Sequence, residues 1–465
     1  MVTSRSRGGA MHDLLERAAD VAAFEAWRAR GQATGWCRNP VRLVGASEHV
    51  ATATGEVIAT FTSAALPDRV LLKACGHRRA TRCPTCSATY QADAFQLMAA
   101  GLRGGKGIPE TVAEHPFCFA TLTAPSFGPV HSTREADGRA RPCRPEPVTA
   151  CVHGRLQTCP AIHHQDDPAV GQAICADCFD YIGAVIWNAH AGELWRRTTI
   201  AIRRVLAKLA GIPASSLKNH VRISFAKVIE YQRRGTIHVH AVIRLDAAEG
   251  DTEAPSAPFD IGLLTTAIRQ AVTRTTAPFP ASPGLTGPGR WGTQLDLRPI
   301  GLNGAVPGVV AAYLAKYATK STDPAGLLDL PVTQGDLERL DDQLTPHLAR
   351  LVRTAWDLGG RLELKDLRLR AWAHTLGFRG HWLTKSRAYS TTFAALRAAR
   401  HDWRTNQGRA DVASEETVPI GTWRYAGRGW TTQGDAWLAE SAADAIATTR
   451  RLAAIERRTA RPESI

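Results

Sequence analysis

The most informative segment of this chain reads Ile229-Glu230-Tyr231-Gln232-Arg233-Arg234-Gly235-Thr236-Ile237-His238-Val239-His240-Ala241-Val242-Ile243. Its two arms are rich in apolar and β-branched residues, which favour strands. Between them, Arg233-Arg234-Gly235 suits a three-residue turn in which the glycine takes a left-handed backbone conformation. The segment therefore predicts an antiparallel β-hairpin whose second strand carries two histidines.

His238 and His240 must share one face of their strand, because side chains alternate across a strand. In a three-residue-turn register Glu230 lies opposite His238, so the carboxylate and both imidazoles converge; a two-residue turn would put Glu230 on the other face. These three side chains can hold a hard divalent ion and leave positions open for phosphate oxygens. Oxygen donors favour magnesium or manganese, and the imidazoles favour manganese. A half-buried strand with two hydrogen-bonded histidines is the alternative interpretation.

A second segment, Ala311 to Lys320, places two tyrosines four residues apart and therefore on one side of a predicted helix. Two of only seven tyrosines, Tyr313 and Tyr317, occur here, and Lys316 and Lys320 share their flank. A phenol attacks phosphorus effectively only when the phosphate charge is neutralised and the phenol is helped to ionise. The pattern predicts a catalytic tyrosine pair, although an isolated pair of this kind also occurs in helix packing. Which tyrosine attacks first is not determined by the pattern.

With these motifs in place, the chain resembles the HUH endonucleases that initiate rolling-circle replication. His238-Val239-His240 followed by Tyr313 and Tyr317 is similar to the two-tyrosine initiators, and the strand from Phe117 to Gly128 is similar to the first motif of that family. More closely, the chain resembles the replication initiators of actinobacterial plasmids and integrative conjugative elements, over roughly residues 37 to 400. The further segments that carry this likeness are Cys75-Gly76-His77-Arg78-Arg79, Cys83-Pro84-Thr85-Cys86, Trp187-Asn188-Ala189 and Gly380-His381-Trp382-Leu383-Thr384-Lys385-Ser386-Arg387.

The resemblance implies a site-specific endonuclease that nicks one strand at an origin, forms a 5′-phosphotyrosine and later rejoins the strand. Its expected partners are single- and double-stranded origin DNA and a host helicase, because the chain has no Walker-type nucleotide-binding motif; no small-molecule cofactor is expected. A relaxase or transposase that mobilises DNA is an alternative, but relaxases usually place the tyrosine ahead of the histidines. A non-catalytic, zinc-containing DNA-binding regulator is a second alternative.

The overall charge agrees with a polyanionic partner. The chain has 57 Lys and Arg against 43 Asp and Glu, which gives a net charge of +14 and a pI near 9.6. No apolar segment near the N-terminus indicates a signal peptide, and no uncharged apolar run is long enough to cross a membrane. We therefore expect a cytoplasmic protein in a reducing compartment.

Ten cysteines in such a compartment are more typical of metal ligands than of disulfides. Two Cys-x-x-Cys pairs predict two structural zinc sites with all four ligand positions filled. The first site is expected to use Cys37, Cys75, Cys83 and Cys86. The second is expected to use Cys151, Cys159, Cys175 and Cys178. His77 can replace a ligand of the first site, and Cys143, His153 and His163 are alternatives in the second.

The predicted fold class is α+β: an HUH endonuclease-like antiparallel sheet with flanking helices, two structural zinc modules and a basic helical C-terminal region. Residues 1–110 are expected to form an N-terminal helix and zinc module. Residues 111–330 would form the catalytic domain, with the second zinc module inserted at 143–180. Residues 331–465 would form a mainly helical DNA-binding region. The predicted DNA-binding residues are Arg233, Arg234, Lys385, Arg387, Arg397 and Arg400.

Overall fold

The computed structural model describes residues 12–15, 17, 19–146, 149–248, 253–300, 306–320, 328, 330–406 and 417–459. The chain forms two compact units. The central unit consists of residues 94–392 and contains the histidine hairpin. The terminal unit combines residues 1–93 with residues 393–465, so it is built from both ends of the chain.

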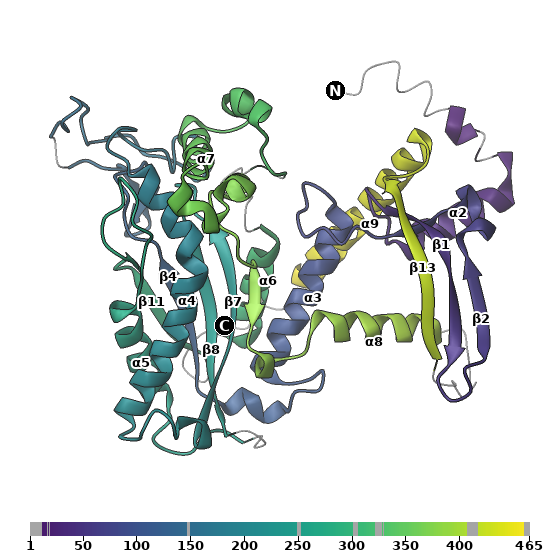
Figure 1. Ribbon diagram of the computed structural model, residues 1–465, viewed down its shortest axis with the longest axis horizontal. Helices are drawn as coiled ribbons and strands as arrows, with labels where there is room; N and C mark the ends of the chain where they lie inside the picture. The colour runs from purple at the N-terminus through teal and green to yellow at the C-terminus, as the bar shows by residue number, and fades with distance from the viewer. Residues whose placement is uncertain are drawn as a thin grey trace. The chain divides into compact units, whose positions relative to one another are not determined.

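The central unit is organised around a five-stranded sheet in which every neighbouring pair is antiparallel. In spatial order its strands are β11 (Leu295–Ile300), β4 (Phe117–Thr123), β8 (Ile237–Ala247), β7 (Val221–Tyr231) and β12 (Leu383–Lys385). The predicted hairpin is the β7–β8 pair at the middle of this sheet (Figure 1).

The register of the hairpin is the one expected for a three-residue turn. Glu230 pairs with His238, and the Gln232 N–H donates to the Thr236 carbonyl at 2.9 Å. Gly235 closes the turn at φ +79°, a conformation that suits glycine. A Cβ atom at this glycine would also lie 2.3 Å from a methyl group of Leu351, so a larger residue would have to displace this buried leucine.

The main hydrophobic core lies on one face of this sheet. Residues of β8 that alternate with the two histidines, including Val239 and Ala241, are buried in it. Helices α4 (Tyr181–Leu209) and α5 (Ile261–Arg274) cover this face, and α4 contributes Trp187. The histidines therefore point to the opposite face, which is approached by α6 (Pro307–Lys320).

A buried polar network fixes the far end of β8. The Asp246 carboxylate accepts hydrogen bonds from Arg244 and from the Ser224 hydroxyl, and it pairs with His115 at 3.0 Å. Arg244 also donates to the Gly101 carbonyl at 2.5 Å. Because both ions are almost completely buried, their mutual pairing is needed to offset desolvation.

The terminal unit has its own sheet, with strand order β13-β1-β2 and β3 paired beside β1. Its strands are β1 (Val41–Ala51), β2 (Val57–Thr62), β3 (Leu71–Lys73) and β13 (Thr417–Arg428). Its helices are α2 (Val21–Ala33), α8 (Phe393–Asn406) and α9 (Gln433–Thr459), together with the first half of α3 (Pro84–Arg103). A small core of Trp27, Leu72, Trp430 and Ala439 joins helices to sheet.

The remaining elements of the central unit are short, apart from one helix. They are the hairpin β5 (Arg134–Ala136) and β6 (Arg139–Arg141), the pair β9 (Thr276–Ala277) and β10 (Gly289–Arg290), and α7 (Pro346–Leu358). Short 3-10 segments, which include Leu362–Leu367 and Leu369–Thr375, connect α7 to β12.

The α+β class with antiparallel sheets is confirmed, but the predicted domain boundaries do not coincide with the two units. Residues 331–392 belong to the central unit, because α7 enters the main core and β12 completes the central sheet. Residues 393–465 belong with the N-terminal residues, because β13 pairs along the whole of β1. Within the described ranges, no helix has both the length and the apolar character that a membrane crossing requires.

Candidate active site and metal centres

Neighbouring strands fix the two histidine rings. In the β4–β8 register Thr121 lies opposite His240 and Thr123 opposite His238. The Thr121 hydroxyl hydrogen-bonds with His240 Nδ1 at 3.2 Å, and the Thr123 hydroxyl with His238 Nε2 at 3.3 Å. His240 Nε2 then lies 3.3 Å from the Glu230 carboxylate. The threonine hydroxyl thus leaves the other nitrogen of His240 directed at Glu230.

The electrostatic environment keeps His238 neutral. Burial, together with the nearby His240 and Arg234, lowers the pKa of His238 to about 3. A neutral imidazole retains a lone pair, which is the form that binds a metal ion. His238 is therefore in the correct protonation state to act as a ligand at neutral pH.

Helix α6 brings both tyrosines to the histidine face. Its stripe of Ala311, Leu314, Ala315 and Ala318 is buried, while Tyr313 and Tyr317 on its flank remain partly exposed. The ring centroid of His240 lies 5.2 Å from that of Tyr313 and 5.3 Å from that of Tyr317. The two phenol rings are 4.5 Å apart. Residues distant in sequence therefore form a single cluster of imidazoles and phenols.

Burial raises the pKa of Tyr313 well above its usual value, and hydrogen bonding to Tyr317 and the charge of Glu230 raise it further. Arg298 acts in the opposite direction. The phenol is therefore held in its neutral form, and a nearby cation would be required to ease its ionisation. Lys316 Nζ lies 5.7 Å from the centre of the Tyr317 ring. Lys320 is the last residue of α6, and its side chain lies outside the described part of the structure.

Glu230, His238 and His240 are residue types that bind divalent ions, but only two of the three lie close enough to share one. Glu230 and His240 are close enough to share an ion, since ligand atoms about 3 Å apart are usual around one. Among the described residues, three groups of Cys and His have ligand atoms that all lie within 4.8 Å of one another, and Glu230, His238 and His240 do not form such a group. Three-fold ligation would require these three side chains to come closer together.

The turn of the hairpin is held by contacts that sequence reasoning missed or assigned differently. Asn188 of α4, completely buried, donates to the Gly235 carbonyl at 2.9 Å and accepts from the Ile237 N–H at 3.1 Å. Arg234 donates to the carbonyls of Ala124 and Pro125, both at 3.0 Å. These bonds tie the turn to α4 and to the end of β4.

The predicted DNA contacts at the turn are therefore not supported by the geometry. Arg234 is partly buried, burial lowers its pKa to about 10, and its guanidinium is used by backbone carbonyls. Arg233 likewise donates to the Asp167 carbonyl at 2.7 Å. Two adjacent arginines in a turn suggest a phosphate contact. Here they bind backbone carbonyls of segments distant in sequence, which a local pattern does not reveal.

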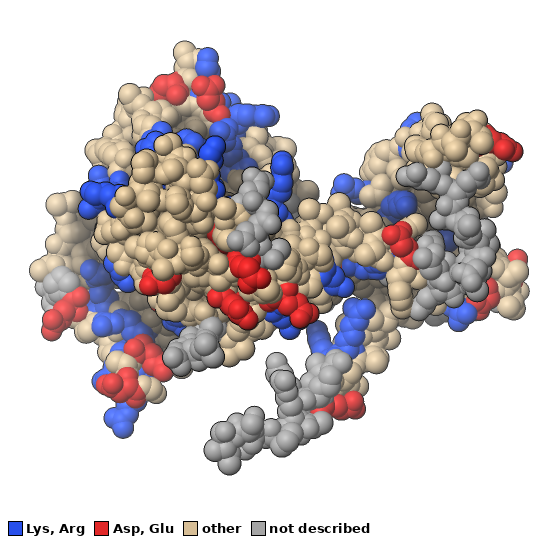
Figure 2. All heavy atoms as spheres, turned by 90° about the horizontal axis from the view of Figure 1, so that it is seen from below, with Lys and Arg blue, Asp and Glu red and all other residues tan. Residues whose placement is uncertain are grey.

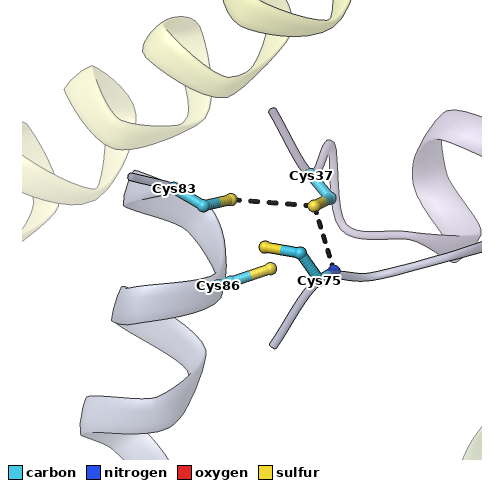
Figure 3. Close-up of side chains that lie close together, drawn as sticks. All are labelled: Cys37, Cys75, Cys83 and Cys86. Carbon is cyan, nitrogen blue, oxygen red and sulfur yellow. Dashed lines mark hydrogen bonds between the residues drawn. The ribbon is translucent and has the colours of Figure 1, made fainter. Parts of the chain in front are cut away.

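The first cysteine cluster lies in the terminal unit and consists of Cys37, Cys75, Cys83 and Cys86, whose sulfur atoms all lie within 4.8 Å of one another (Figure 3). Cys83 directly precedes α3 and Cys86 lies in its first turn, while Cys37 precedes β1 and Cys75 follows β3. Hydrogen bonding with Cys37, helped by Cys86, lowers the pKa of Cys75 to about 7, against the opposing effects of Cys83 and of burial. Four sulfurs at this separation are a set suited to tetrahedral zinc.

His77 is not part of that cluster. Its Nδ1 instead accepts a hydrogen bond from the Arg79 N–H at 3.2 Å.

The predicted second zinc site is corrected by the structure, because its residues divide between two clusters. Cys151, Cys175 and Cys178 lie together with His153, which takes the position expected for Cys159. The His153 Nδ1 is 3.3 Å from the Cys178 sulfur. The turn from Cys151 to Gly154 brings cysteine and histidine to the same point, a local geometry that spacing alone did not distinguish.

Cys159 belongs to a third cluster with His131, Cys143 and His163. An antiparallel bridge between Arg144 and Cys159 brings the two cysteines together. The His163 Nε2 lies 3.3 Å from the Cys159 sulfur, while its Nδ1 hydrogen-bonds with Asp167 at 2.6 Å. A carboxylate on the second ring nitrogen is typical of a metal-binding histidine.

His131 was missed by the sequence analysis, because it lies outside the predicted insertion at 143–180. The sequence did indicate a further site, because Cys143 and His163 were left over once four ligands had been assigned to the second site. The described part of the chain thus contains three Cys/His clusters able to bind zinc, where two were predicted.

The predicted DNA-binding residues of the C-terminal region differ in availability. Lys385 donates to the carbonyls of Ser386, Arg387 and Ser390, so its ammonium group is used within the protein. Arg400 pairs with the buried carboxylate of Asp93. Arg387 and Arg397 are exposed.

The surface charge does not by itself locate a DNA-binding face. On the face drawn in Figure 2, Lys and Arg side chains are interspersed with groups of Asp and Glu. The net charge of +14 is therefore not gathered there into one continuous basic surface. Particular contacts are better guides than overall charge.

Comparison with known proteins identifies the family of the chain. The family model described as RepSA, replication initiator protein of pSAM2, matches residues 23–444. A curated replication initiator protein from Streptomyces ambofaciens is 42% identical over 458 residues, covering 95% of this chain and 94% of the relative. No solved structure matches the chain.

Proposed function

Because the chain belongs to the RepSA family of replication initiator proteins, we propose that it starts rolling-circle replication of a plasmid or integrative element by nicking one DNA strand through a tyrosine. The observation that carries this proposal is the cluster of His240, Tyr313 and Tyr317 rings on the face of the central sheet opposite the main core. Its partly exposed phenols are accessible to a DNA strand, whereas tyrosines that only fill a core would be buried.

In the proposed reaction one phenol oxygen, here assigned to Tyr313, bonds to phosphorus while the bond from phosphorus to the 3′ oxygen breaks. The phenol loses its proton and the departing 3′ oxygen gains one. The products are a 5′-phosphotyrosine and a 3′-hydroxyl that primes synthesis. Tyr317 would serve the second transfer, which rejoins the strand.

Glu230, His238 and His240 would hold magnesium or manganese, which supplies positive charge to polarise the scissile phosphate. Thr121 and Thr123 orient the two imidazoles for this task. Lys316 adds a positive charge beside Tyr317, where it favours the ionised phenol or contacts phosphate. Duplex opening would be left to a separate host helicase.

Transfer of a label to the protein tests this proposal. A single-stranded origin oligonucleotide labelled at its 3′ end is incubated with the protein and manganese, and covalent protein–DNA is resolved on a denaturing gel. The 3′ fragment carries the attacked phosphate, so the label should move to the protein. Tyr313→Phe combined with Tyr317→Phe should abolish the adduct. Tyr425→Phe, which keeps the aromatic ring of an exposed tyrosine in the terminal unit and removes only its hydroxyl, should not.

Two results would contradict the proposal. An adduct that persists in the double variant would assign the nucleophile to another residue. Origin binding by the wild-type protein without any cleavage in magnesium or manganese would indicate an initiator that binds DNA and leaves nicking to another protein.

A further inference from the structure

The sheet of the terminal unit leaves an unusual surface exposed. Each residue of β2 is exposed, and most residues of β13 are exposed as well. Strand pairing places Phe61 opposite Ser47, Trp423 opposite Gly45 and Tyr425 opposite Leu43. Because Leu43, Gly45 and Ser47 alternate along β1, the three aromatic side chains stand on the same face. We name this the aromatic face.

The aromatic rings form a broad surface rather than isolated side chains. The centroids of Phe61 and Trp423 are 5.9 Å apart, and Tyr425 is 61% exposed. The Phe61 and Trp423 rings border a shallow hollow of about 390 Å³, which Lys73 and His49 also line. Large aromatic side chains exposed in a row cost solubility and are normally retained for binding.

The charge of the aromatic face is complementary to phosphate. At one end of the face, Val41 of β1 is flanked by Lys73 on β3 and by Arg428 on β13. Among the described residues that strand pairing places on this face, none is acidic; Glu48 points to the opposite face. A surface of rings bordered by cations, without carboxylates, suits a flexible polyanion that carries flat bases.

Lys73 also connects the aromatic face to a neighbouring groove. This groove has a volume of about 680 Å³ and runs between β3, α3 and α8 of the same unit. The exposed Arg397 lines it, with its guanidinium 5.9 Å from the centre of the Phe393 ring, and Phe393 in turn stacks on Tyr90 at 5.1 Å. Asp93 also lines the groove and is paired with Arg400, which leaves Lys73 and Arg397 as the other charged lining residues. A groove with net positive charge therefore continues into the aromatic face through one shared lysine.

We propose that the terminal unit binds single-stranded DNA along this path, with phosphates on Arg397 and Lys73 and unpaired bases stacked on Phe61, Trp423 and Tyr425. A duplex cannot use such a surface, because its bases already stack on one another, whereas unpaired bases stack readily on exposed aromatic rings of a sheet. The inference rests on the proposed function only in taking DNA as the nucleic acid. It supplies a place for the strand that nicking and unwinding release.

Binding of a fluorescein-labelled oligothymidylate to the full-length protein, followed by anisotropy, tests the inference. Trp423→Leu and Phe61→Leu should each weaken binding about tenfold. Arg397→Ala should reduce the slope of log affinity against log salt by about one. Trp437→Leu is the matched control, because Trp437 is 56% exposed in the same unit but lies on α9. Affinity that is unchanged in Trp423→Leu and Phe61→Leu, or lowered equally in the control, would overturn the inference.

A second measurement avoids variants altogether. The wild-type protein is photo-crosslinked to an oligonucleotide containing 5-iododeoxyuridine, and the modified peptides are identified by mass spectrometry. Crosslinks to Phe61, Trp423 or Tyr425 support the inference, and crosslinks confined to residues 94–392 overturn it. Equal competition by a duplex of the same length would also overturn it, because the proposed surface requires unpaired bases.

The outcome is separable from that of the nicking proposal. Trp423→Leu is also assayed for the covalent adduct at saturating origin oligonucleotide. Weakened oligothymidylate binding with a normal adduct yield supports both proposals. A wild-type protein that forms no adduct would refute nicking, while the anisotropy result would still decide the role of the aromatic face.

Discussion

The imidazole of His240 lies edge-on to the phenol of Tyr313, with ring centroids 5.2 Å apart and ring planes at 89°. His240 comes from the middle of the central sheet, and Tyr313 comes from a helix much later in the chain. Phe119 of β4 lies against both rings, at 6.0 Å from His240 and 5.7 Å from Tyr313. The candidate metal ligand and the candidate nucleophile are thus held together by the packing of sheet against helix.

The hydroxyl of Thr121 should tune metal binding, because it orients the ring of His240. Replacing Thr121 by Val keeps the shape and removes the hydrogen bond. We expect the manganese concentration for half-maximal cleavage to rise about 10- to 100-fold, as is usual when the partner of a metal-binding histidine is removed. Thr265→Val, whose hydroxyl bonds only to the backbone of α5, is the control. If Thr121→Val and Thr265→Val required the same manganese concentration for half-maximal cleavage, Thr121 would have no role in metal binding.

The three Cys/His clusters predict three zinc ions in each protein molecule, measured by mass spectrometry of the metal content. Cys151→Ser and Cys159→Ser should each remove one ion, and the double variant should remove two, because the residues belong to separate clusters. If the two cysteines shared one site, the double variant would lose only one. Cys118→Ala, a buried strand residue outside all three clusters, should keep the full complement.

Arg234 should matter for stability and not for DNA affinity. Its guanidinium donates to two carbonyls at the end of β4, and charged hydrogen bonds of this kind contribute roughly 1.5–3 kcal/mol each before any allowance for partial exposure. We expect Arg234→Ala to lower the free energy of unfolding by about 2 kcal/mol. The slope of log affinity against log salt for DNA should stay unchanged. A slope smaller by about one would instead identify Arg234 as a phosphate contact.

The buried Asp246 should make the central unit sensitive to acid. Burial alone raises the pKa of this carboxyl, but hydrogen bonds from His115, Arg244 and Ser224 overcome that effect and leave the pKa at about 2. Because the folded pKa lies below the unfolded value of about 3.9, the ionised carboxylate contributes roughly 2 kcal/mol above pH 4. That contribution is lost as the pH falls from about 4 to about 2.

Chemical denaturation as a function of pH can check this expectation. Asp246→Asn should destabilise the protein at pH 7 by on the order of 3 kcal/mol, because Arg244 is left buried without its carboxylate. The variant should also lose less stability than the wild-type protein between pH 4 and pH 2. Parallel acid curves for the two proteins would show that another group governs the transition.

Local patterns in the sequence were sufficient for the hairpin and for the paired ligands. The turn Arg233-Arg234-Gly235 sets its own register through one glycine conformation, and strand alternation then puts His238 and His240 on one face. The two Cys-x-x-Cys pairs likewise each stay within one cluster, because a two-residue spacing lets both thiols reach one ion.

Contacts between segments distant in sequence were decided by long-range packing, because they depend on the path of the whole chain. Only the tertiary structure placed Cys159 with His131 instead of Cys151, used Arg234 to hold the end of β4, and returned β13 to pair with β1. Residue types and spacing specify which side chains are able to bind a metal or DNA. Which of them meet is settled by the burial of apolar surface between elements far apart in sequence.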